Sequence, residues 1–455
     1  MTMTAATVEG TRTPAPPVPV TLEDTGLGAD QIEQLLIKTL YGGEATGLML
    51  AERLRLPFAI LEPLIERIRG EHLIEVRGTT GTSSASYRYA MTDLGRSRAV
   101  QYLEINQYTG AAPVPLSSYV KQMRALAASR GFIDRERMHG GFGHLIISDH
   151  ILEQLGPAAN ANKAIFLYGP PGNGKTVLAE GLGRTLGGDM YMPYAIDIEG
   201  HIVTMFDPIS HEPLEEFETT SPTSIIAGEP RDRRWIRIRR PVVMVGGELT
   251  LDMLDLRFNS LARFYEAPLQ LKANGGIFLV DDFGRQRMRP EDLLNRWIVP
   301  LESRIDYLTL HTGKKFQVPF DVLTVFATNL DPMSLADEAF LRRIPYKIHV
   351  EDPTIEQFTS ILEMNCRRRD MEFHPVMAAY LQRRHYQPTN RPLRACHPRD
   401  LLDQVTALCR YRGQEPTLTR ENLDAACAAY FLDDDRAEAA VPPPSHQGRR
   451  AVEVG

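Results

Sequence analysis

Apolar residues recur every three or four positions in some segments and stand in short continuous runs in others. This change of pattern separates the parts of the chain. Within residues 21–110, three segments carry apolar side chains every three or four positions, which is the spacing of amphipathic helices. These segments are 32–40, 48–56 and 57–68. Two short strand-like stretches, 72–76 and 87–91, flank a loop rich in Gly, Thr and Ser, and a last helix is expected from Asp93. The pattern predicts a small domain of three helices followed by a two-stranded hairpin.

The rest of the chain divides into a mixed part and a helical part. Residues 146–350 alternate short apolar strands with helical segments, which is typical of α/β proteins with a parallel sheet. Residues 351–432 have helical periodicity and few strand signals, so we expect a small all-helical domain there. Residues 111–145 are interpreted as a linker that contains an extended, proline-rich connector at 112–115. The two ends, 1–20 and 433–455, are rich in Pro and small residues and are predicted to be flexible tails.

Composition and charge narrow the class of protein. The 455 residues are 43% hydrophobic and 24% charged, which suits a soluble globular chain. A net charge of −7 argues against a chain-wide attraction to nucleic acid or anionic lipid. No apolar run approaches the ~18 residues that span a bilayer. The first ten residues lack the basic-then-apolar pattern of a signal peptide. We therefore expect a cytoplasmic protein without membrane insertion, in which the four cysteines are reduced, buried thiols.

One segment has the pattern of a phosphate-binding loop. Gly169-Pro170-Pro171-Gly172-Asn173-Gly174-Lys175-Thr176 fits GxxxxGK[ST] at every fixed position. An apolar strand, 164–168, precedes it, and helical residues from Val177 follow it. The glycines let the backbone curl so that amide N–H groups face one point, and the following helix adds its positive end. Lys175 is predicted to bind the outer phosphates and Thr176 to ligate Mg²⁺.

Acidic and polar residues follow two other buried strands. Asp281 and Asp282 come directly after the apolar run 277–280, at the strand end where ligands collect in open α/β sheets. Asp281 is predicted to hold Mg²⁺ and Asp282 to orient or deprotonate the attacking water, although Asp282 could instead cap a following helix. Asn329 follows the strand 322–326 and could hold the same water or simply form a turn.

Three arginines beyond these strands have two interpretations each. Arg342 and Arg343 could be solvated surface charges, or one could reach the nucleotide of a neighbouring subunit. Arg399 opens a helical segment in the last domain. It could reach the γ-phosphate or pair locally, and the segment by itself favours local pairing.

Taken in order, these segments resemble the AAA+ ATPases. Residues 169–176 match Walker A and residues 277–282 match Walker B, while Asn329 falls at sensor 1. The remaining matches are Arg342 and Arg343 at the arginine finger, Arg399 at sensor 2, and Ile146 in a segment similar to the one that contacts adenine. The resemblance covers about 140–430.

The resemblance implies a fold, a chemistry and an assembly. It implies a five-stranded parallel P-loop sheet with a helical lid, ATP and Mg²⁺ as ligands, ATP hydrolysis, and a homo-oligomeric ring that is usually a hexamer. Residues 272–276 and 318–320 look most like the MoxR and Lon-like branch. The element order of residues 21–110 resembles a winged helix-turn-helix domain.

The sequence departs from the AAA+ pattern at two places. Walker B usually ends in Asp-Glu, whereas this chain has Asp281-Asp282, whose shorter second carboxylate predicts slow hydrolysis. Extra material at about 195–250 is first acidic and then basic. The basic stretch 231–240 could grip an acidic partner or nucleic acid around Trp235, or pair with the acidic residues before it.

Three functions remain in competition. The chain could remodel a protein client through ATP hydrolysis, act as a DNA-binding regulator or loader, or serve as a nucleotide-gated scaffold that barely hydrolyses ATP. Residues 21–110 hold nine Lys/Arg and twelve Asp/Glu, a net charge of −3. DNA binding depends mainly on excess cations at phosphates, so we favour a protein client or adaptor over DNA.

Overall fold

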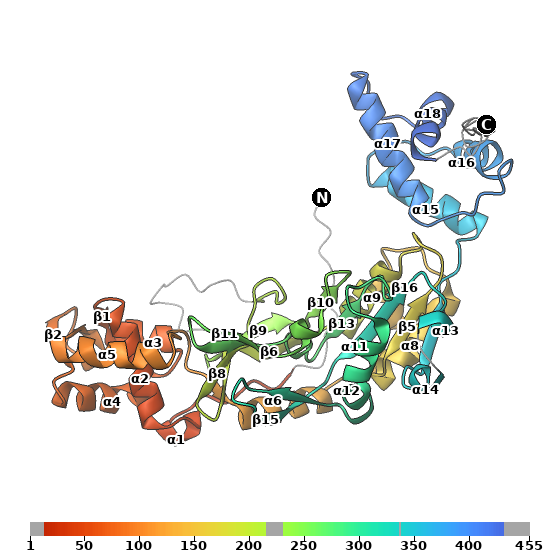
Figure 1. The fold of residues 1–455 in the computed structure, drawn as a ribbon. Helices are drawn as coiled ribbons and strands as arrows, with labels where there is room; N and C mark the ends of the chain where they lie inside the picture. Colours follow the sequence, from red (N-terminus) through yellow and green to blue (C-terminus); the bar gives the residue numbers. More distant parts are fainter. Residues whose placement is uncertain (1–12, 215–230, 336–337, 432–455) are drawn as a thin grey trace, which may run out of the picture. The chain divides into compact units, whose positions relative to one another are not determined.

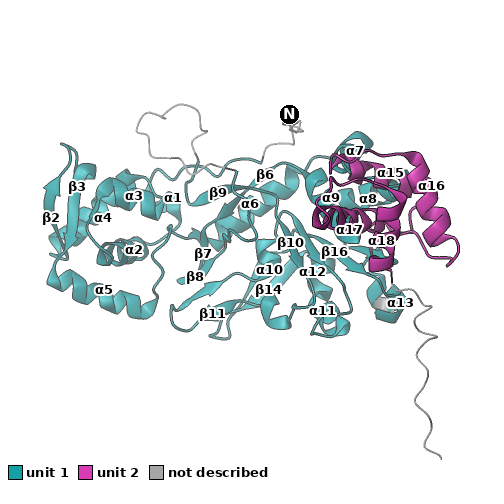
Figure 2. Ribbon diagram, turned by 90° about the horizontal axis from the view of Figure 1, so that it is seen from above, with its two compact units in different colours: residues 1–170, 175–350 teal, residues 171–174, 351–455 magenta. Residues whose placement is uncertain are grey.

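The computed structural model describes residues 13–214, 231–335 and 338–431. The chain forms two compact units: residues 1–170 with 175–350, and residues 171–174 with 351–455 (Figure 2). Within the described ranges, no helix has both the length and the apolar character needed to cross a bilayer.

The N-terminal part of the first unit is a small helical bundle with a three-stranded sheet (Figure 1). Its elements are α1 (Leu22–Thr25), α2 (Ala29–Tyr41), β1 (Ala45–Thr46), α3 (Gly47–Leu54), α4 (Phe58–Gly70), β2 (Ile74–Thr79), β3 (Tyr87–Met91) and α5 (Asp93–Ile105). The hydroxyls of Thr46 and Thr92 cap α3 and α5 by accepting backbone N–H bonds. The apolar positions that predicted the helices, such as Ile32, Leu36 and Leu61, are fully buried. This element order is the one on which the resemblance to a winged helix rests.

A parallel sheet forms the centre of the first unit. Its strands lie in the order β10 (Val242–Val245), β13 (Ile277–Val280), β16 (Leu323–Thr328), β5 (Ile165–Tyr168) and β17 (Tyr346–His349), and every pair is parallel. Strands β13 and β16 are buried along their whole length, as expected where both faces of a parallel sheet are covered. The α/β fold class predicted from the sequence, with a five-stranded parallel sheet, is confirmed.

Alternate residues of each strand face two different helical layers. Leu167, Leu279 and Val325 pack with α7 (Arg135–Phe142), α8 (Asp149–Ala161) and α9 (Lys175–Leu186). Phe166 and Phe278 point the other way. They pack with α11 (Pro290–Arg296), α12 (Ile298–Ser303) and α14 (Glu338–Leu341).

A second sheet is built from segments on both sides of the phosphate loop. Its order is β11 (Arg257–Asn259), β12 (Phe264–Glu266), β8 (His201–Thr204), β7 (Ala195–Ile198) and β4 (Val114–Pro115). The residues predicted to form an extended connector at 112–115 therefore end in an edge strand, which pairs in parallel with β7. The predicted insertion at 195–250 also has different limits, because β10 belongs to the central sheet and β11 and β12 lie beyond residue 250. Helix α6 (Leu116–Ala128) and the hairpin of β14 (Ile305–Thr309) with β15 (Lys315–Pro319) complete this region.

Most arginines of the basic stretch 231–240 contact other residues of the first unit, although Arg233 and Arg239 are exposed. It contains β9 (Trp235–Arg239), which pairs with β6 (Asp189–Pro193), and Trp235 is 3% exposed. The arginine contacts are Arg234 with Asp232, Arg237 with Asp189, Arg239 with Glu212, and Arg240 with the carbonyls of Gly187 and Gly275. Arg234, Arg237 and Arg240 are thus engaged within the fold, whereas Arg239 is 64% exposed beside Glu212, so intramolecular pairing is favoured over a cationic surface around Trp235. The acidic residues Glu215, Glu216 and Glu218 lie outside the described residues.

All regular elements described in the second unit are helical. They are α15 (Ile355–Arg367), α16 (Pro375–Leu381), a π-helical turn (Gln382–Tyr386), α17 (His397–Tyr411) and α18 (Arg420–Tyr430). Phe358, Leu401 and Leu423 belong to their common apolar core. The four cysteines are free thiols; Cys366, Cys409 and Cys427 are buried, whereas Cys396 is half-buried.

Candidate functional site

The phosphate loop has a backbone that its glycines make possible. It follows β5, and Gly169, Gly172 and Gly174 have φ values of +137°, +82° and +78°, which L side chains rarely adopt. A Cβ on Gly169 would lie 2.4 Å from the carbonyl oxygen of Val350. Helix α9 begins at Lys175, so its N-terminal N–H groups adjoin the loop.

Lys175 and Thr176 connect this loop to the end of β13. The Lys175 ammonium donates to the carbonyl oxygens of Gly169 at 3.0 Å and Pro170 at 2.9 Å. The Thr176 hydroxyl donates to Asp281 Oδ2 at 2.7 Å. Residues that are 105 positions apart in the chain are thus brought together, as the predicted Mg²⁺ site requires. A hydroxyl beside a carboxylate is the oxygen donor set that suits this ion.

Asn329 lies at the end of β16, the strand between β5 and β13. The sheet order places β16 between β5 and β13, and Asn329 follows β16 directly. Its Oδ1 is buried and has no hydrogen-bond partner among the residues that the structure describes. A buried amide oxygen without a partner is costly, so this atom suits a polar ligand or water at the strand ends.

Asp282 is exposed and adopts an unusual backbone conformation. Its φ is +48°, and its N–H donates to Asp281 Oδ1 at 3.0 Å. The next helix, α11, begins only at Pro290. The alternative that Asp282 caps a following helix is therefore wrong, because no helix starts there.

Two residues that the sequence analysis did not single out hold this turn. Gln286 bonds the backbone of Asp281, Asp282 and Gly284, while Thr328 donates to the carbonyl oxygen of Phe283 at 2.7 Å. Its position directly before Asn329 could have marked Thr328 as a candidate site residue. Nothing in the sequence marks Gln286.

The two candidate finger arginines differ in their surroundings. Arg343 Nε lies 2.6 Å from Glu302 Oε1, and its side chain is 22% exposed. Arg342 is exposed, and its side chain forms no hydrogen bond or ion pair within the described ranges. Of the two, Arg342 is therefore the one whose guanidinium is not engaged by a described residue of its own chain.

Asn173, within the loop, belongs to the second unit and is hydrogen-bonded to other residues of that unit. Its Nδ2 donates to Asp352 Oδ1 at 2.7 Å and to the carbonyl oxygen of Glu351 at 3.1 Å. Its Oδ1 accepts the N–H of Ala395 at 3.2 Å. Both N–H donors of the side chain and one lone pair of its oxygen are thus used by protein groups.

The remaining predicted site residues are placed as follows. Arg399 pairs with Asp400 at 2.8 Å and is 62% exposed, which agrees with the local pairing that the segment favoured. Ile146 is half-buried in the loop between α7 and α8, and Val177, in the first turn of α9, is 36% exposed.

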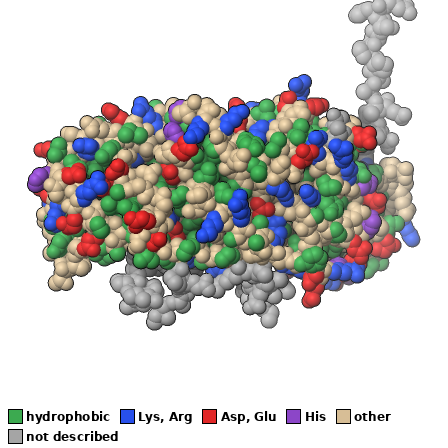
Figure 3. Space-filling model, turned by 90° about the horizontal axis from the view of Figure 1, so that it is seen from below, with side chains coloured by type: hydrophobic (Ala, Val, Ile, Leu, Met, Phe, Trp, Pro, Cys, Tyr) green, Lys and Arg blue, Asp and Glu red, His purple; other side chains and the backbone are tan. Residues whose placement is uncertain are grey.

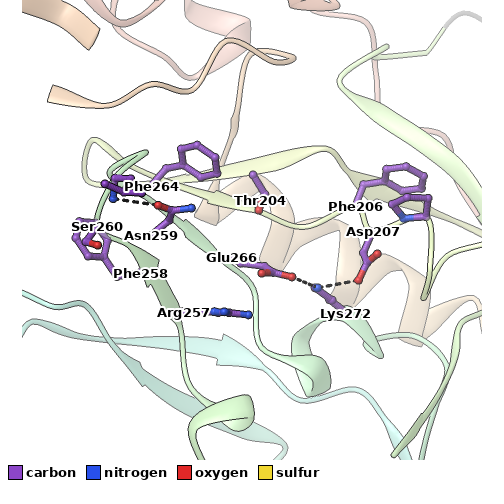
Figure 4. Close-up of a pocket in the computed structure, with 12 residues that line it drawn as sticks. Thr204, Phe206, Asp207, Arg257, Phe258, Asn259, Ser260, Phe264, Glu266 and Lys272 are labelled. Atoms are coloured by element: carbon purple, nitrogen blue, oxygen red, sulfur yellow. Dashed lines mark hydrogen bonds and ion pairs between the residues drawn. The ribbon is translucent and has the colours of Figure 1, made fainter. Parts of the chain in front are cut away.

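A separate pocket lies in the second sheet, away from every predicted site residue (Figure 4). It has a volume of about 590 Å³ and is lined by Phe206, Arg257, Phe264 and others. Lys272, at the end of α10 (Leu269–Lys272), is held there by Asp207 at 2.8 Å and Glu266 at 2.6 Å. Burial lowers the Lys272 pKa, but the hydrogen bonds to the two carboxylates outweigh burial and raise it overall. The buried Lys272 ammonium is therefore fully paired, while the two carboxylates leave one negative charge at a pocket where Glu266 is 48% exposed.

A family model described as "Domain of unknown function (DUF8689)" matches residues 354–429, which lie in the second unit. No curated protein matches the chain.

Solved structures that are similar to this chain include a RuvB mutant and NtrX. A mutant of RuvB from Thermotoga maritima is 14% identical with a TM-score of 0.37, over 63% of this chain and 71% of that one. NtrX from Brucella abortus is 16% identical with a TM-score of 0.40, over 76% and 70%. Since these TM-scores lie below 0.5, the description of the fold rests on the sheet order and phosphate loop of this chain.

Proposed function

We propose that this chain is an AAA+ ATPase that binds ATP with Mg²⁺ at the ends of β5, β16 and β13. The observation that carries the proposal is the 2.7 Å hydrogen bond from Thr176 to Asp281, formed next to a GxxxxGK[ST] loop with the required glycine conformations. A surface turn without a phosphate-binding role would not require both these glycine conformations and a hydroxyl–carboxylate pair. The AAA+ assignment further rests on the order of motifs in the sequence.

The reaction proposed is hydrolysis of ATP to ADP and phosphate. Lys175 binds the outer phosphates, and Thr176 and Asp281 hold Mg²⁺, which when bound neutralises charge on the phosphate oxygens. Asp282 takes a proton from the attacking water while the water oxygen bonds to the γ-phosphorus. The bond from that phosphorus to the ADP oxygen breaks. Asn329, whose buried Oδ1 has no partner among the described residues, orients the water.

The active form is proposed to be a ring of identical subunits, a hexamer by the AAA+ resemblance. Arg342 is the better candidate for the finger that reaches a neighbouring nucleotide, because Arg343 is held by Glu302 of its own chain. An arginine supplied in this way stabilises charge on the transferring phosphate. Arg399 at sensor 2 and the MoxR and Lon-like branch remain predictions.

A cytoplasmic protein client or adaptor is the partner we favour. The N-terminal domain is acidic, and the arginines of β9 are each paired with a carboxylate, Arg237 with Asp189 and Arg239 with Glu212. On the face drawn in Figure 3, cationic and anionic side chains are interspersed, and no extended cationic patch stands out. DNA is the second candidate, because the element order of residues 21–110 resembles a winged helix-turn-helix domain.

The test is ATP turnover by the purified full chain and by Asp282→Asn. The variant is expected to bind ATP without hydrolysing it, because the proton acceptor is lost. Asp370→Asn is the matched control, since Asp370 is another exposed aspartate with a positive φ, +54°, that lies in the second unit. Wild-type turnover in Asp282→Asn would contradict the catalytic assignment. A chain that binds ATP but has no turnover would favour the nucleotide-gated scaffold.

A further inference from the structure

The turn that presents Asp282 is held on one side by a single glutamine. Gln286 Nε2 donates to the carbonyl oxygens of Asp281 at 2.8 Å and Asp282 at 3.1 Å. Its Oε1 accepts the N–H of Gly284 at 2.8 Å. An amide side chain offers two N–H donors and one carbonyl acceptor, so nearly its whole capacity is spent on this one turn.

The other side of the turn is fixed to the neighbouring strand. The N–H of Phe283 donates to the carbonyl oxygen of Ala327 at 2.7 Å. The Thr328 hydroxyl donates to the carbonyl oxygen of Phe283 at 2.7 Å and accepts the N–H of Leu330 at 3.1 Å. Thr328 is 1% exposed and directly precedes Asn329, so one hydroxyl ties the Asp282 turn to the backbone on the far side of the proposed water-binding residue.

These bonds stabilise a conformation that most residues disfavour. Asp282 has φ +48° and Gly284 has φ +99°. Among residues with a side chain, Asp and Asn enter this left-handed region most readily. A glutamate would bring a longer side chain without that tolerance. The backbone therefore gives a physical reason for aspartate at a position where the AAA+ resemblance expects glutamate.

We propose that Gln286 and Thr328 are positioning residues that hold Asp282 in its left-handed conformation, and that the active site is built for this shorter carboxylate. The inference rests on the proposed ATPase function and deepens it. Neither side chain contacts Lys175 or Thr176 through a hydrogen bond in the described residues. Their loss is therefore expected to change the rate of hydrolysis and leave nucleotide affinity almost unchanged.

Two substitutions at Gln286 separate the donor from the bulk of the side chain. Gln286→Glu keeps the size and the acceptor for Gly284 but cannot donate to the two carbonyls when ionised. Gln286→Met keeps the length and loses both functions. Because misplacement of a reacting group by about 1 Å can cost ~100-fold, both variants are expected to lose about 10- to 100-fold in kcat. Asp282→Glu is expected to lower kcat as well, and combining it with Gln286→Met should add little further loss.

The experiment measures kcat, KM and ATP affinity in the full chain, with Gln101→Met, at an exposed position of α5, as the matched control. Thermal unfolding of each variant shows whether it remains folded. A fall in kcat with unchanged affinity in Gln286→Glu, and lower turnover in Asp282→Glu, would support the proposal. Unchanged kcat in both Gln286 variants, or faster turnover in Asp282→Glu, would overturn it while leaving the ATPase function intact. A wild-type chain without ATP binding would instead contradict the proposed function.

Discussion

Replacing Thr176 by valine isolates the hydrogen bond that links the phosphate loop to Walker B. Valine has the branched shape of threonine and replaces by a methyl group the hydroxyl that donates to Asp281 Oδ2 at 2.7 Å. In the proposed complex the same hydroxyl oxygen is a ligand of Mg²⁺. The variant should therefore bind ATP more weakly in the presence of Mg²⁺ and equally well without it.

The size of the effect follows from the charge of the ion that the Thr176 hydroxyl would ligate. Loss of the hydroxyl as a Mg²⁺ ligand removes a contact with a charged group, for which we take the strength of a hydrogen bond to a charged group, about 1.5–3 kcal/mol. At about 1.4 kcal/mol per factor of ten, this corresponds to a rise in the Kd for ATP of roughly 10- to 100-fold. The assay is calorimetric titration of ATP into the wild type and the variant, once with Mg²⁺ and once with EDTA.

Thr185→Val is the control, because Thr185 lies in the same helix and its buried hydroxyl donates only to the carbonyl oxygen of Gly181, at 2.9 Å. It should leave the Mg²⁺ dependence of ATP binding at the wild-type value. Equal Mg²⁺ dependence in the wild type and Thr176→Val would refute the assignment of this pair as the metal site.

The remaining predictions concern assembly, DNA and pH. Arg342→Ala should retain ATP binding and lose most turnover, whereas Arg343→Ala should lose less turnover. Mixing Arg342→Ala with inactive Lys175→Ala should recover activity. Turnover that does not depend on protein concentration, from a species that light scattering shows to be a monomer, would exclude a finger from a neighbouring subunit. The full chain should bind double-stranded DNA weakly because its N-terminal domain is acidic, and sub-micromolar, salt-sensitive binding by fluorescence anisotropy would favour the DNA alternative. Burial, together with nearby arginines, lowers the pKa of His397 from 6.5 to about 4, so the unfolded chain binds a proton there that the folded chain does not. Stability of the second unit should therefore fall as pH drops from about 6.5 to about 4, and hydrogen exchange in α17 should show a smaller pH effect in His397→Gln.

Local sequence signals predicted most of the fold. Apolar spacing located α2, α3 and α4, and the buried runs at 277–280 and 322–326 were sufficient to predict a parallel sheet. The second sheet could not be predicted in the same way. Its strands are short and pair across long separations, such as Val114 with Ile196, so no local pattern marks the partner.

The sequence likewise predicted one part of the candidate site and missed another. The loop glycines and Asp281 stand in fixed motifs, and their chemistry predicted the pairing that brings Thr176 to Asp281. The positive φ of Asp282 and its support by Gln286 arise from hydrogen bonds to backbone carbonyls. Since backbone groups are the same at every residue, such bonds leave no trace in a sequence. The sequence likewise could not separate Arg342 from Arg343, because the difference is the contact with Glu302 on helix α12.

The most direct test of the account is calorimetric titration of Mg²⁺ and ATP into the wild type and Lys175→Ala. Lys175 provides the side-chain cation of the phosphate loop, and its ammonium already lies across the loop carbonyls of Gly169 and Pro170. The account predicts saturable binding of one ATP per wild-type chain and severely weakened or absent binding in Lys175→Ala. Absence of binding in the wild type, or the same affinity in both proteins, would contradict the claim that this loop binds ATP.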